Sequence, residues 1–428
     1  MLNHNQNTRG RLIYTIFLFL VYEFIIKDLN LSINTSIYGL FFILILSYYI
    51  FGVYSLREKY NFKEFLITFL LNATIFFILL LFHKKSAIIL ALIFYTVAQS
   101  LIRAILEKIY KKNIRVIVLG QETFVENLKE LLLNDPDYTY LGFIAKNIKY
   151  GLGDIIELDK IINKFKCDMI IYIKEQEEEY LNNIFDLKIK RKKVIDSETF
   201  LQHKEGKVSV ENLSKSDIIH SLGFDMLTSN FENRIKRVSD ISLSLIILIL
   251  AFPLIMLIYI FVKLDKPQHF FTNPAFFKQK RIGIGGRNFE MIKFRSMKIH
   301  DPSKYSKYTS KNDERITFVG KFIRKTRLDE LPQIINILKG NMSFVGPRPE
   351  WDKLGREYEK KINLYNIRYA VKPGLTGWAQ VMYPYGFSLE DAKQKLEYDL
   401  YYIKYQNFSL DIIILFKTLK IIFFGKGL

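Results

Sequence analysis

Two adjacent carboxylates, Asp329 and Glu330, lie in a segment that is rich in cations. Arg324 and Arg327 precede the pair, and Arg348 follows between two prolines. Guanidinium groups that are held rigidly are suited to bind phosphate oxygens. Adjacent helical residues point about 100° apart, so we do not expect the two carboxylates to share a proton. We expect separate roles instead, one carboxylate attacking an electrophile and the other holding a metal ion.

The same pattern also has a purely structural interpretation. Asp329 could cap a helix that has Pro332 in its first turn and ends at Gly340. The apolar stripe of this predicted helix is Leu331, Ile334, Ile335 and Leu338, and its polar face is Asp329, Gln333 and Asn336. A helix cap requires no neighbouring arginines, so the clustered cations favour the chemical interpretation.

Four apolar runs in the first hundred residues predict helices that cross a membrane. Each is about 15 to 20 residues long, close to what a hydrocarbon core of about 30 Å requires. Most of their flanking Lys and Arg residues lie on one side, which places both ends of this region in the cytoplasm. The runs are Leu12 to Ile26, Ile37 to Tyr54, Phe65 to Phe82 and Ala87 to Leu101.

The charge and the cysteine content limit the classes of partner and cofactor. The net charge is +19, with 62 Lys and Arg among 428 residues. Anionic lipids and phosphorylated substrates attract such charge as nucleic acids do. The basic residues cluster beside apolar segments, so we expect no nucleic-acid partner. The single cysteine, Cys167, cannot form an intramolecular disulfide and has no metal-ligand spacing.

A segment from Asn113 to Phe200 alternates between strand and helix patterns, in the order of a Rossmann-like half. Gly120 ends the first predicted strand, but QETFV follows it where a dinucleotide site would continue GxGxxG. We therefore expect a structural or regulatory module. Asp135 and Asp137 form a DxD pair that a polar turn explains better than a metal site.

The apolar run from Ile241 to Val262 is long enough to span a membrane, but Pro253 lies near its middle. Proline removes a helical hydrogen bond and crowds the preceding turn, which predicts a kink. Positive residues flank both ends of the run, so both ends are expected on the cytoplasmic side. We predict a helix that dips into the membrane and returns, with an ordinary kinked span as the alternative. The flanking residues are Arg234, Lys236, Arg237, Lys263 and Lys266.

Two further segments are expected to support the site. FFKQKRIGIGGRNFEMIKF reads as a hairpin with Gly283, Gly285 and Gly286 at its turn. Near the C-terminus, Lys417 and Lys420 interrupt an apolar stretch. Burying two ammonium groups in hydrocarbon is costly, so we predict an interfacial helix whose lysines extend to the headgroups.

Seven motifs in the C-terminal half resemble those of the bacterial sugar transferases, the monotopic phosphoglycosyl transferases. They are NRIKRVSDISLS, FFKQKRIGIGG, KFRSM, RKTRLDELPQ, LKGNMSFVGPRP, KPGLTGWAQV and KLEYDLYYIK. With its four spans and Rossmann-like segment, the chain is similar to the large membrane-bound members that start exopolysaccharide, capsule or O-antigen units. The resemblance implies transfer of a sugar-1-phosphate from a UDP-sugar to undecaprenyl phosphate, with release of UMP and use of Mg²⁺.

The resemblance also implies roles for particular residues. Asp329 is the expected nucleophile, Glu330 the expected magnesium ligand, and Pro253 the proline that breaks the membrane helix. Many members have Ser before that proline, whereas this chain has Phe252. The predicted substrate-binding residues are Lys293, Arg295, Arg324, Arg327, Gln333, Pro347, Arg348, Pro349, Arg368 and Gln380.

We therefore predict an α/β membrane protein in the bacterial inner membrane, with its catalytic domain facing the cytoplasm. Residues 1–110 form four transmembrane helices, and residues 111–230 form the degenerate Rossmann-like module and a linker. Residues 231–428 form the catalytic domain, with the re-entrant helix at 241–262 and the interfacial C-terminal helix. The first two regions are candidate surfaces for a homo-oligomer. The alternative function is a non-catalytic membrane scaffold or nucleotide-sugar sensor for polysaccharide assembly.

Overall fold

The computed structural model divides the chain into two compact units, Met1–Glu205 and Gly206–Leu428. We call them the N-terminal and the C-terminal unit and describe each by itself. The structure describes residues 4–28, 40–41, 43–45, 48, 68–74, 76–77, 79, 87–110, 113–146, 151–211, 213, 230–265, 273–298, 313–383, 386 and 388–424.

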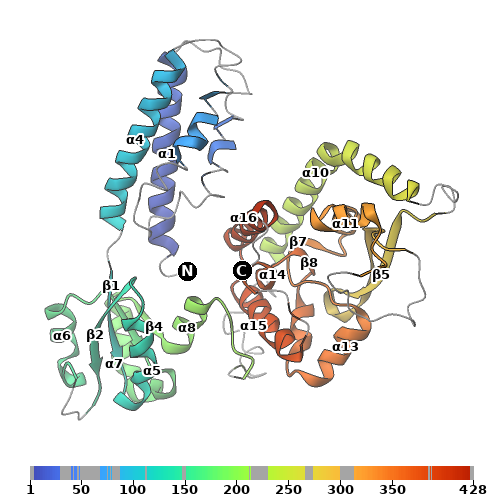
Figure 1. Cartoon of the computed structure of the whole chain (residues 1–428). Helices are drawn as coiled ribbons and strands as arrows, with labels where there is room; N and C mark the ends of the chain where they lie inside the picture. The colour runs from blue at the N-terminus through green and yellow to red at the C-terminus, as the bar shows by residue number, and fades with distance from the viewer. Residues whose placement is uncertain are drawn as a thin grey trace. The chain divides into compact units, whose positions relative to one another are not determined.

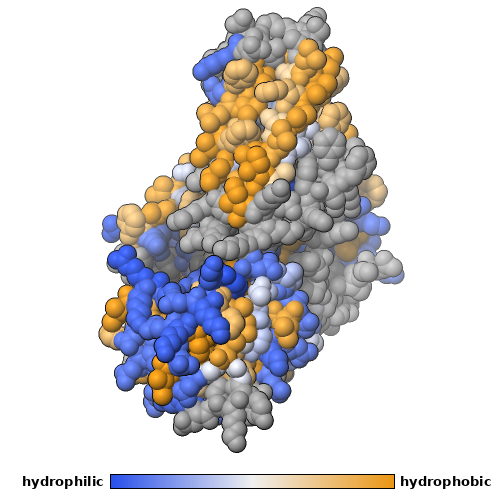
Figure 2. Space-filling model, turned by 90° about the vertical axis from the view of Figure 1, so that its left-hand side faces the viewer, coloured by the Kyte–Doolittle hydropathy of each residue, from blue (hydrophilic) through white to orange (hydrophobic). Residues whose placement is uncertain are grey.

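The N-terminal unit begins with two long helices that lie side by side, α1 (His4–Asp28) and α4 (Ala87–Tyr110) (Figure 1). Tyr22 and Tyr95 contact each other edge to face between them, 6.3 Å apart at the ring centroids. The outward face of the pair is hydrophobic, as the orange surface of Figure 2 shows. The first and fourth predicted runs fall on α1 and α4, whereas the second and third lie only in part within the described residues.

Two helices among the described residues are long and apolar enough to cross a membrane. One is Ile88–Leu106 within α4, and the other is Phe231–Leu264 in the C-terminal unit.

A four-stranded parallel sheet of order β2-β1-β3-β4 forms the rest of the N-terminal unit. The helices α6 and α7 cover one face and α5 and α8 the other, so alternate residues of each strand are buried in two separate cores. The alternation of strands and helices that the sequence predicts for this segment is confirmed. The strands are β1 (Ile114–Leu119), β2 (Tyr138–Ile144), β3 (Met169–Tyr172) and β4 (Val194–Asp196). The helices are α5 (Glu122–Leu133), α6 (Leu158–Lys164), α7 (Glu177–Ile189) and α8 (Ser197–Glu205).

The turn after β1 is already filled by protein. Gly120 has φ +153°, and a Cβ there would lie 2.5 Å from Ile173 Cγ1. The Gln121 N–H at the start of α5 donates to the side-chain oxygen of Gln176 over 2.9 Å. In dinucleotide-binding folds this end of the helix binds phosphate. The Gln176 side chain occupies that donor.

The C-terminal unit begins with α10 (Asn230–Leu264), a 35-residue helix that contains Pro253. Figure 1 shows this helix bending part-way along its length. A bend is expected because Pro253 cannot donate its backbone hydrogen bond. Ile249 and Leu250 in the middle of the helix are 73% and 76% exposed.

Both ends of α10 pack on the same α/β unit. Near its start, Asp240 accepts hydrogen bonds from Ser343 and Phe344. Near its end, Ile258 and Val262 are buried in a cluster with strand and helix residues that follow in the chain. The exposed apolar middle therefore lies between two anchored ends.

A hairpin, a short pair of parallel strands and further helices complete the described part of the C-terminal unit. The hairpin strands β5 (Phe276–Ile282) and β6 (Asn288–Phe294) are antiparallel, and Gly285 and Gly286 have positive φ at its turn, as predicted. A second, parallel pair is β7 (Ser343–Val345) with β8 (Gly374–Thr376). The helices are α11 (Phe318–Lys325), α12 (Gln333–Lys339), α13 (Asp352–Lys361), α14 (Trp378–Met382), α15 (Leu389–Tyr405) and α16 (Phe408–Phe424).

The C-terminal helix α16 is part of the core of this unit. Its Leu410 and Ile414 are buried in the largest hydrophobic cluster. Lys417 does not extend away from the protein as predicted, because its ammonium lies over the Trp378 ring, 5.4 Å from the centroid. Lys420 is exposed.

The two anchored ends of α10 predict that the segments before and after it lie on one side of a membrane. Arg234→Cys and Lys278→Cys, each in a Cys167→Ser background, place thiols at exposed positions on either side of the apolar region. A membrane-impermeant maleimide should modify both only after it gains access to the cytoplasm. Modification of Lys278→Cys alone from outside intact cells would show that α10 crosses the membrane.

Candidate active site

The acid pair lies in a turn of 3-10 helix, η7 (Leu328–Glu330). Arg327, directly before it, has the left-handed conformation with φ 60°. This conformation is uncommon for residues other than glycine and is often found at functional sites. The interpretation of Asp329 as a helix cap is wrong, because Pro332 occupies the N-cap position of α12. Gly340 ends that helix with φ +84°, as predicted.

Glu330 is the meeting point of three segments of the chain. Its Oε1 atom accepts hydrogen bonds from Lys293 Nζ on β6, over 2.7 Å, and from Arg348 Nη2 after β7, over 3.1 Å. Burial acts to raise the pKa of the Glu330 carboxyl, but the charges of Arg348 and Lys293 outweigh this effect and hold the pKa well below its usual range. Glu330 is therefore ionised and fixed in position.

Asp329 has a contrasting environment. Among the residues that the structure describes, it forms no hydrogen bond or ion pair, and burial raises the pKa of its carboxyl. The positive charges of Lys293, Arg324 and Arg327 oppose that rise. A carboxylate that is partly desolvated and has no fixed partner can attack an electrophile. Glu330 is thus fixed by two cations, whereas Asp329 has no fixed partner among the described residues. This difference is what we expect if one acid holds a metal ion and the other is the nucleophile.

Other residues hold Arg348 in place through hydrogen bonds to its side chain and to the backbone of its loop. Its Nη1 donates to Gln380 Oε1 over 3.1 Å, beside the bond to Glu330. Behind the loop, Arg368 Nη2 donates to the Arg348 carbonyl over 3.0 Å, and Arg281 Nη1 donates to the Pro349 carbonyl over 3.0 Å. The guanidinium of Arg348 is therefore presented from a braced loop.

The other predicted substrate-binding residues fall into two groups. Arg324 and Arg327 lie close enough to Asp329 to influence its charge. Arg295 and Arg368 are buried and bind other parts of the protein. Arg295 donates to the Val262 carbonyl at the end of α10. The predicted contacts of these residues with substrate stay predictions.

Gln333 lies in the first turn of α12 and is 2% exposed. Its Nε2 atom has no hydrogen-bond partner among the described residues. A buried amide donor without a partner is unusual and can serve a ligand.

Sequence reasoning missed the acids that brace the loop. Arg368 forms ion pairs with Asp399, over 2.8 Å, and with Glu350, over 3.3 Å. Burial raises the pKa of Asp399 to about 6 in spite of the Arg368 charge. A signal was available, because Asp399 follows Leu396 by three residues and precedes Ile403 by four, within an apolar stripe. An acid on such a face indicates a buried ion pair.

Comparisons with known proteins match this region. Residues 231–425 match the family model described as bacterial sugar transferase. The chain is 36% identical over 185 residues to a UDP-glucose:undecaprenyl-phosphate glucose-1-phosphate transferase from Caulobacter vibrioides, covering 43% of this chain and 67% of that protein. The chain belongs to the bacterial sugar transferase family.

Two further relatives are similar over 222 and 189 residues, respectively. A UDP-N-acetylgalactosamine-undecaprenyl-phosphate N-acetylgalactosaminephosphotransferase from Aeromonas hydrophila is 39% identical, covering 52% of this chain and 50% of that protein. A UDP-glucose:undecaprenyl-phosphate glucose-1-phosphate transferase from Xanthomonas campestris pv. campestris is 46% identical, covering 43% of this chain and 37% of that protein. The chain thus spans half or less of the length of these two relatives.

The contrast between the two acids predicts opposite effects on stability. Glu330→Gln leaves Lys293, whose side chain is only 16% exposed, without its charged partner. Breaking a buried pair typically costs about 3 to 5 kcal/mol, and for this largely buried pair we expect a loss toward the lower end of that range. Asp329→Asn removes a charge that burial disfavours, as its raised pKa indicates, so stability at neutral pH should be unchanged or higher. Thermal unfolding of the purified variants checks both effects. An equal loss in both would contradict the assigned environments.

Proposed function

We propose that this protein transfers a sugar-1-phosphate from a UDP-sugar to undecaprenyl phosphate and releases UMP. The observation that carries the proposal is an Asp329 with no partner among the described residues, beside a Glu330 that two cations fix, within the region that matches the sugar transferase family. The names of the relatives give N-acetylgalactosamine and glucose as the sugars that they transfer. The proposed donor is accordingly a UDP-hexose or a UDP-N-acetylated amino sugar.

A covalent intermediate divides the reaction into two displacements at one phosphorus. Asp329 attacks the phosphorus that bears the sugar, and the bond from that phosphorus to the bridging oxygen breaks. UMP leaves with the electron pair, and the sugar phosphate remains on the carboxylate. An oxygen of the lipid phosphate then attacks the same phosphorus and releases Asp329. The two polyanionic substrates need not be bound at once, which lowers their mutual repulsion.

The cations around the acids have defined roles in this scheme. Arg348 and Lys293 are fixed beside Glu330 and can stabilise negative charge on the transferred phosphoryl oxygens. Arg324 and Arg327 favour the ionised form of Asp329 through their charges. The nucleophile therefore stays ionised while the phosphate oxygens are neutralised.

Magnesium is part of the proposal. No group of three or more His, Cys, Asp or Glu residues suited to a metal occurs within the described residues. Mg²⁺ is commonly bound by one or two carboxylates together with substrate phosphates, so two acids suffice. Both cations contact Oε1 of Glu330, which leaves its second oxygen as the protein ligand. When bound with the diphosphate, the ion would neutralise charge on the leaving UMP.

The surface near the site supports a position at a membrane. The helix α11 precedes the acid pair, and its Phe318 and Phe322 are 91% and 62% exposed. Lys321 and Lys325 on the same helix are also exposed. Apolar side chains next to cations suit an anionic lipid surface. We propose a bacterial inner-membrane protein with four N-terminal spans, a re-entrant α10 and a catalytic unit on the cytoplasmic side.

A membrane scaffold or nucleotide-sugar sensor is the alternative from another class. It requires the acid pair to be structural, but Asp329 is not the cap of α12. A scaffold also gives no reason for a partly desolvated aspartate that has no partner in the described part of the chain. Catalysis separates the two functions.

With Mg²⁺, purified protein should release many UMP molecules per protein from a UDP-sugar when undecaprenyl phosphate is present, and at most one per protein when the lipid is left out. Asp329→Asn should abolish turnover because it removes the attacking oxygen. Glu330→Gln should raise the Mg²⁺ concentration that is needed. A coupled UMP assay measures both. A scaffold would release no UMP with any UDP-sugar tested, and full turnover by Asp329→Asn would exclude it as the nucleophile.

A further inference from the structure

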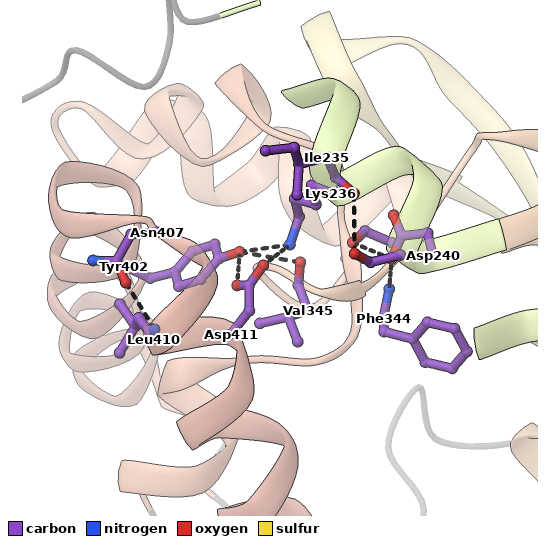
Figure 3. Close-up of polar contacts among 11 residues, drawn as sticks. Ile235, Lys236, Asp240, Phe344, Val345, Tyr402, Asn407, Leu410 and Asp411 are labelled. Atoms are coloured by element: carbon purple, nitrogen blue, oxygen red, sulfur yellow. Dashed lines mark hydrogen bonds and ion pairs between the residues drawn. The ribbon is translucent and has the colours of Figure 1, made fainter. Parts of the chain in front are cut away.

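One turn near the start of α10 makes directed polar contacts with four other elements. Lys236 Nζ donates to Asp411 Oδ2 on α16, over 2.5 Å, and to the Tyr402 hydroxyl on α15, over 3.1 Å. Arg237 and Asp240 on the same turn bind α12 and β7. Figure 3 shows the Lys236 ammonium, the Tyr402 hydroxyl and the Asp411 carboxylate converging in the interior. These residues lie outside the set around Asp329 and Glu330.

The contacts with β7 hold the strand that leads to Arg348. Asp240 Oδ1 accepts hydrogen bonds from the Ser343 hydroxyl and the Phe344 N–H, both over 3.0 Å. The Tyr402 hydroxyl lies 3.2 Å from the Val345 carbonyl, to which it can donate (Figure 3). All three residues of β7 are thus bonded to the network, and Arg348 follows Val345 by three positions.

The contact with α12 holds the helix that directly follows the acid pair. Arg237 donates to the Ile337 carbonyl over 2.5 Å and to the Leu338 carbonyl over 2.7 Å. The last carbonyls of a helix have no partner within it, so a cation there satisfies them. Since α12 has seven residues, its ends are about 10 Å apart, and Glu330 lies just before its start.

We propose that Lys236, Arg237 and Asp240 form a positioning turn that sets the distance between the acid pair and Arg348. Both partners of the Glu330–Arg348 ion pair are attached to this one turn of α10. Glu330 is attached through α12, and Arg348 is attached through β7. The inference rests on the proposed function, because it assigns to these residues the alignment of the phosphoryl-binding groups.

Apolar packing alone would not give this alignment. Leu243 and Ile247 of α10 also pack against the core. Contacts of that kind are not directional, whereas hydrogen bonds weaken steeply when their angle changes. Because the network includes α10, it also links the depth of α10 in a membrane to the geometry of the site. Loss of the contacts to either partner should therefore lower the rate of adduct formation more than it lowers the stability of the fold.

The test is a double-mutant cycle on formation of the covalent adduct. Tyr402→Phe removes the hydroxyl contacts with Val345 and Asp411 and preserves the ring. Single-turnover labelling with UDP-sugar, without lipid acceptor, should show a rate about 10-fold to 100-fold lower, the range expected when a reacting group is misplaced. In an Arg348→Ala background, Tyr402→Phe should change the rate by less than about twofold. Equal losses in both backgrounds would overturn the proposal.

Matched variants separate positioning from stability. Asp240→Asn keeps the acceptor oxygen for Ser343 and Phe344 and should retain most of the rate, whereas Asp240→Ala should lose it. Tyr383→Phe is the control, since its hydroxyl bonds to Asp391 over 2.9 Å, outside the network. It should leave the rate unchanged.

The cycle also distinguishes failure of this inference from failure of the proposed function. If the unmodified protein forms no adduct, the proposed function fails. If it forms the adduct and the effects are additive, or if Asp240→Asn and Asp240→Ala lose the rate equally, only the positioning turn is overturned. Thermal unfolding of Tyr402→Phe should show that the variant is still folded at the temperature of the assay, so that a lower rate reflects misplacement and not unfolding.

Discussion

A single oxygen, Oε1 of Glu330, accepts hydrogen bonds from Lys293 and Arg348, and the C-terminal unit is arranged around this contact. A buried carboxylate is stable only when opposite charges and hydrogen bonds compensate for its lost hydration. Here the compensation comes from two segments distant in sequence, the hairpin strand β6 and the loop after β7. The contact therefore forms only when the whole unit is folded, and it brings the cations to the place where Asp329 lies.

The difference between the two acids follows from the same constraint. Glu330 uses both cations, so Asp329 has no fixed partner among the described residues, although it is adjacent in sequence. The 3-10 geometry of the turn keeps the two side chains apart, since successive residues of a 3-10 helix are about 120° apart. Separate directions were expected from α-helical geometry, and the tighter turn gives the same result. A desolvated nucleophile and a fixed charged group are thereby produced from neighbouring residues.

Sequence alone predicted those features that depend on local geometry. The glycines of the hairpin turn, the end of α12 at Gly340 and the strands of the parallel sheet all follow from backbone preferences and periodicity. The faces of α12 were predicted only in part, since Ile334 is buried as expected but other residues are not on the predicted face. Asn336 is buried because its side chain bonds to Glu290 and Ile292 on β6, whereas Ile335 is 38% exposed.

The basic residues before the apolar run were interpreted only as charges on the cytoplasmic side. The structure shows that Lys236 and Arg237 are donors to internal acceptors. A single sequence does not show which distant segment supplies the acceptor for a buried cation, and for this reason the polar framework was missed. For the same reason Asp399 was not recognised as the partner of Arg368, although its apolar neighbours indicated burial.

The most direct test of the account is the identity of the residue that carries the phosphosugar. The protein is incubated with a labelled UDP-sugar and Mg²⁺ without lipid, digested, and analysed by mass spectrometry of the peptide that contains Asp329 and Glu330. The account predicts one phosphosugar on Asp329, released when undecaprenyl phosphate is added. A modification on Glu330 or on another residue, or lipid-dependent turnover by an Asp329→Asn variant, would contradict it.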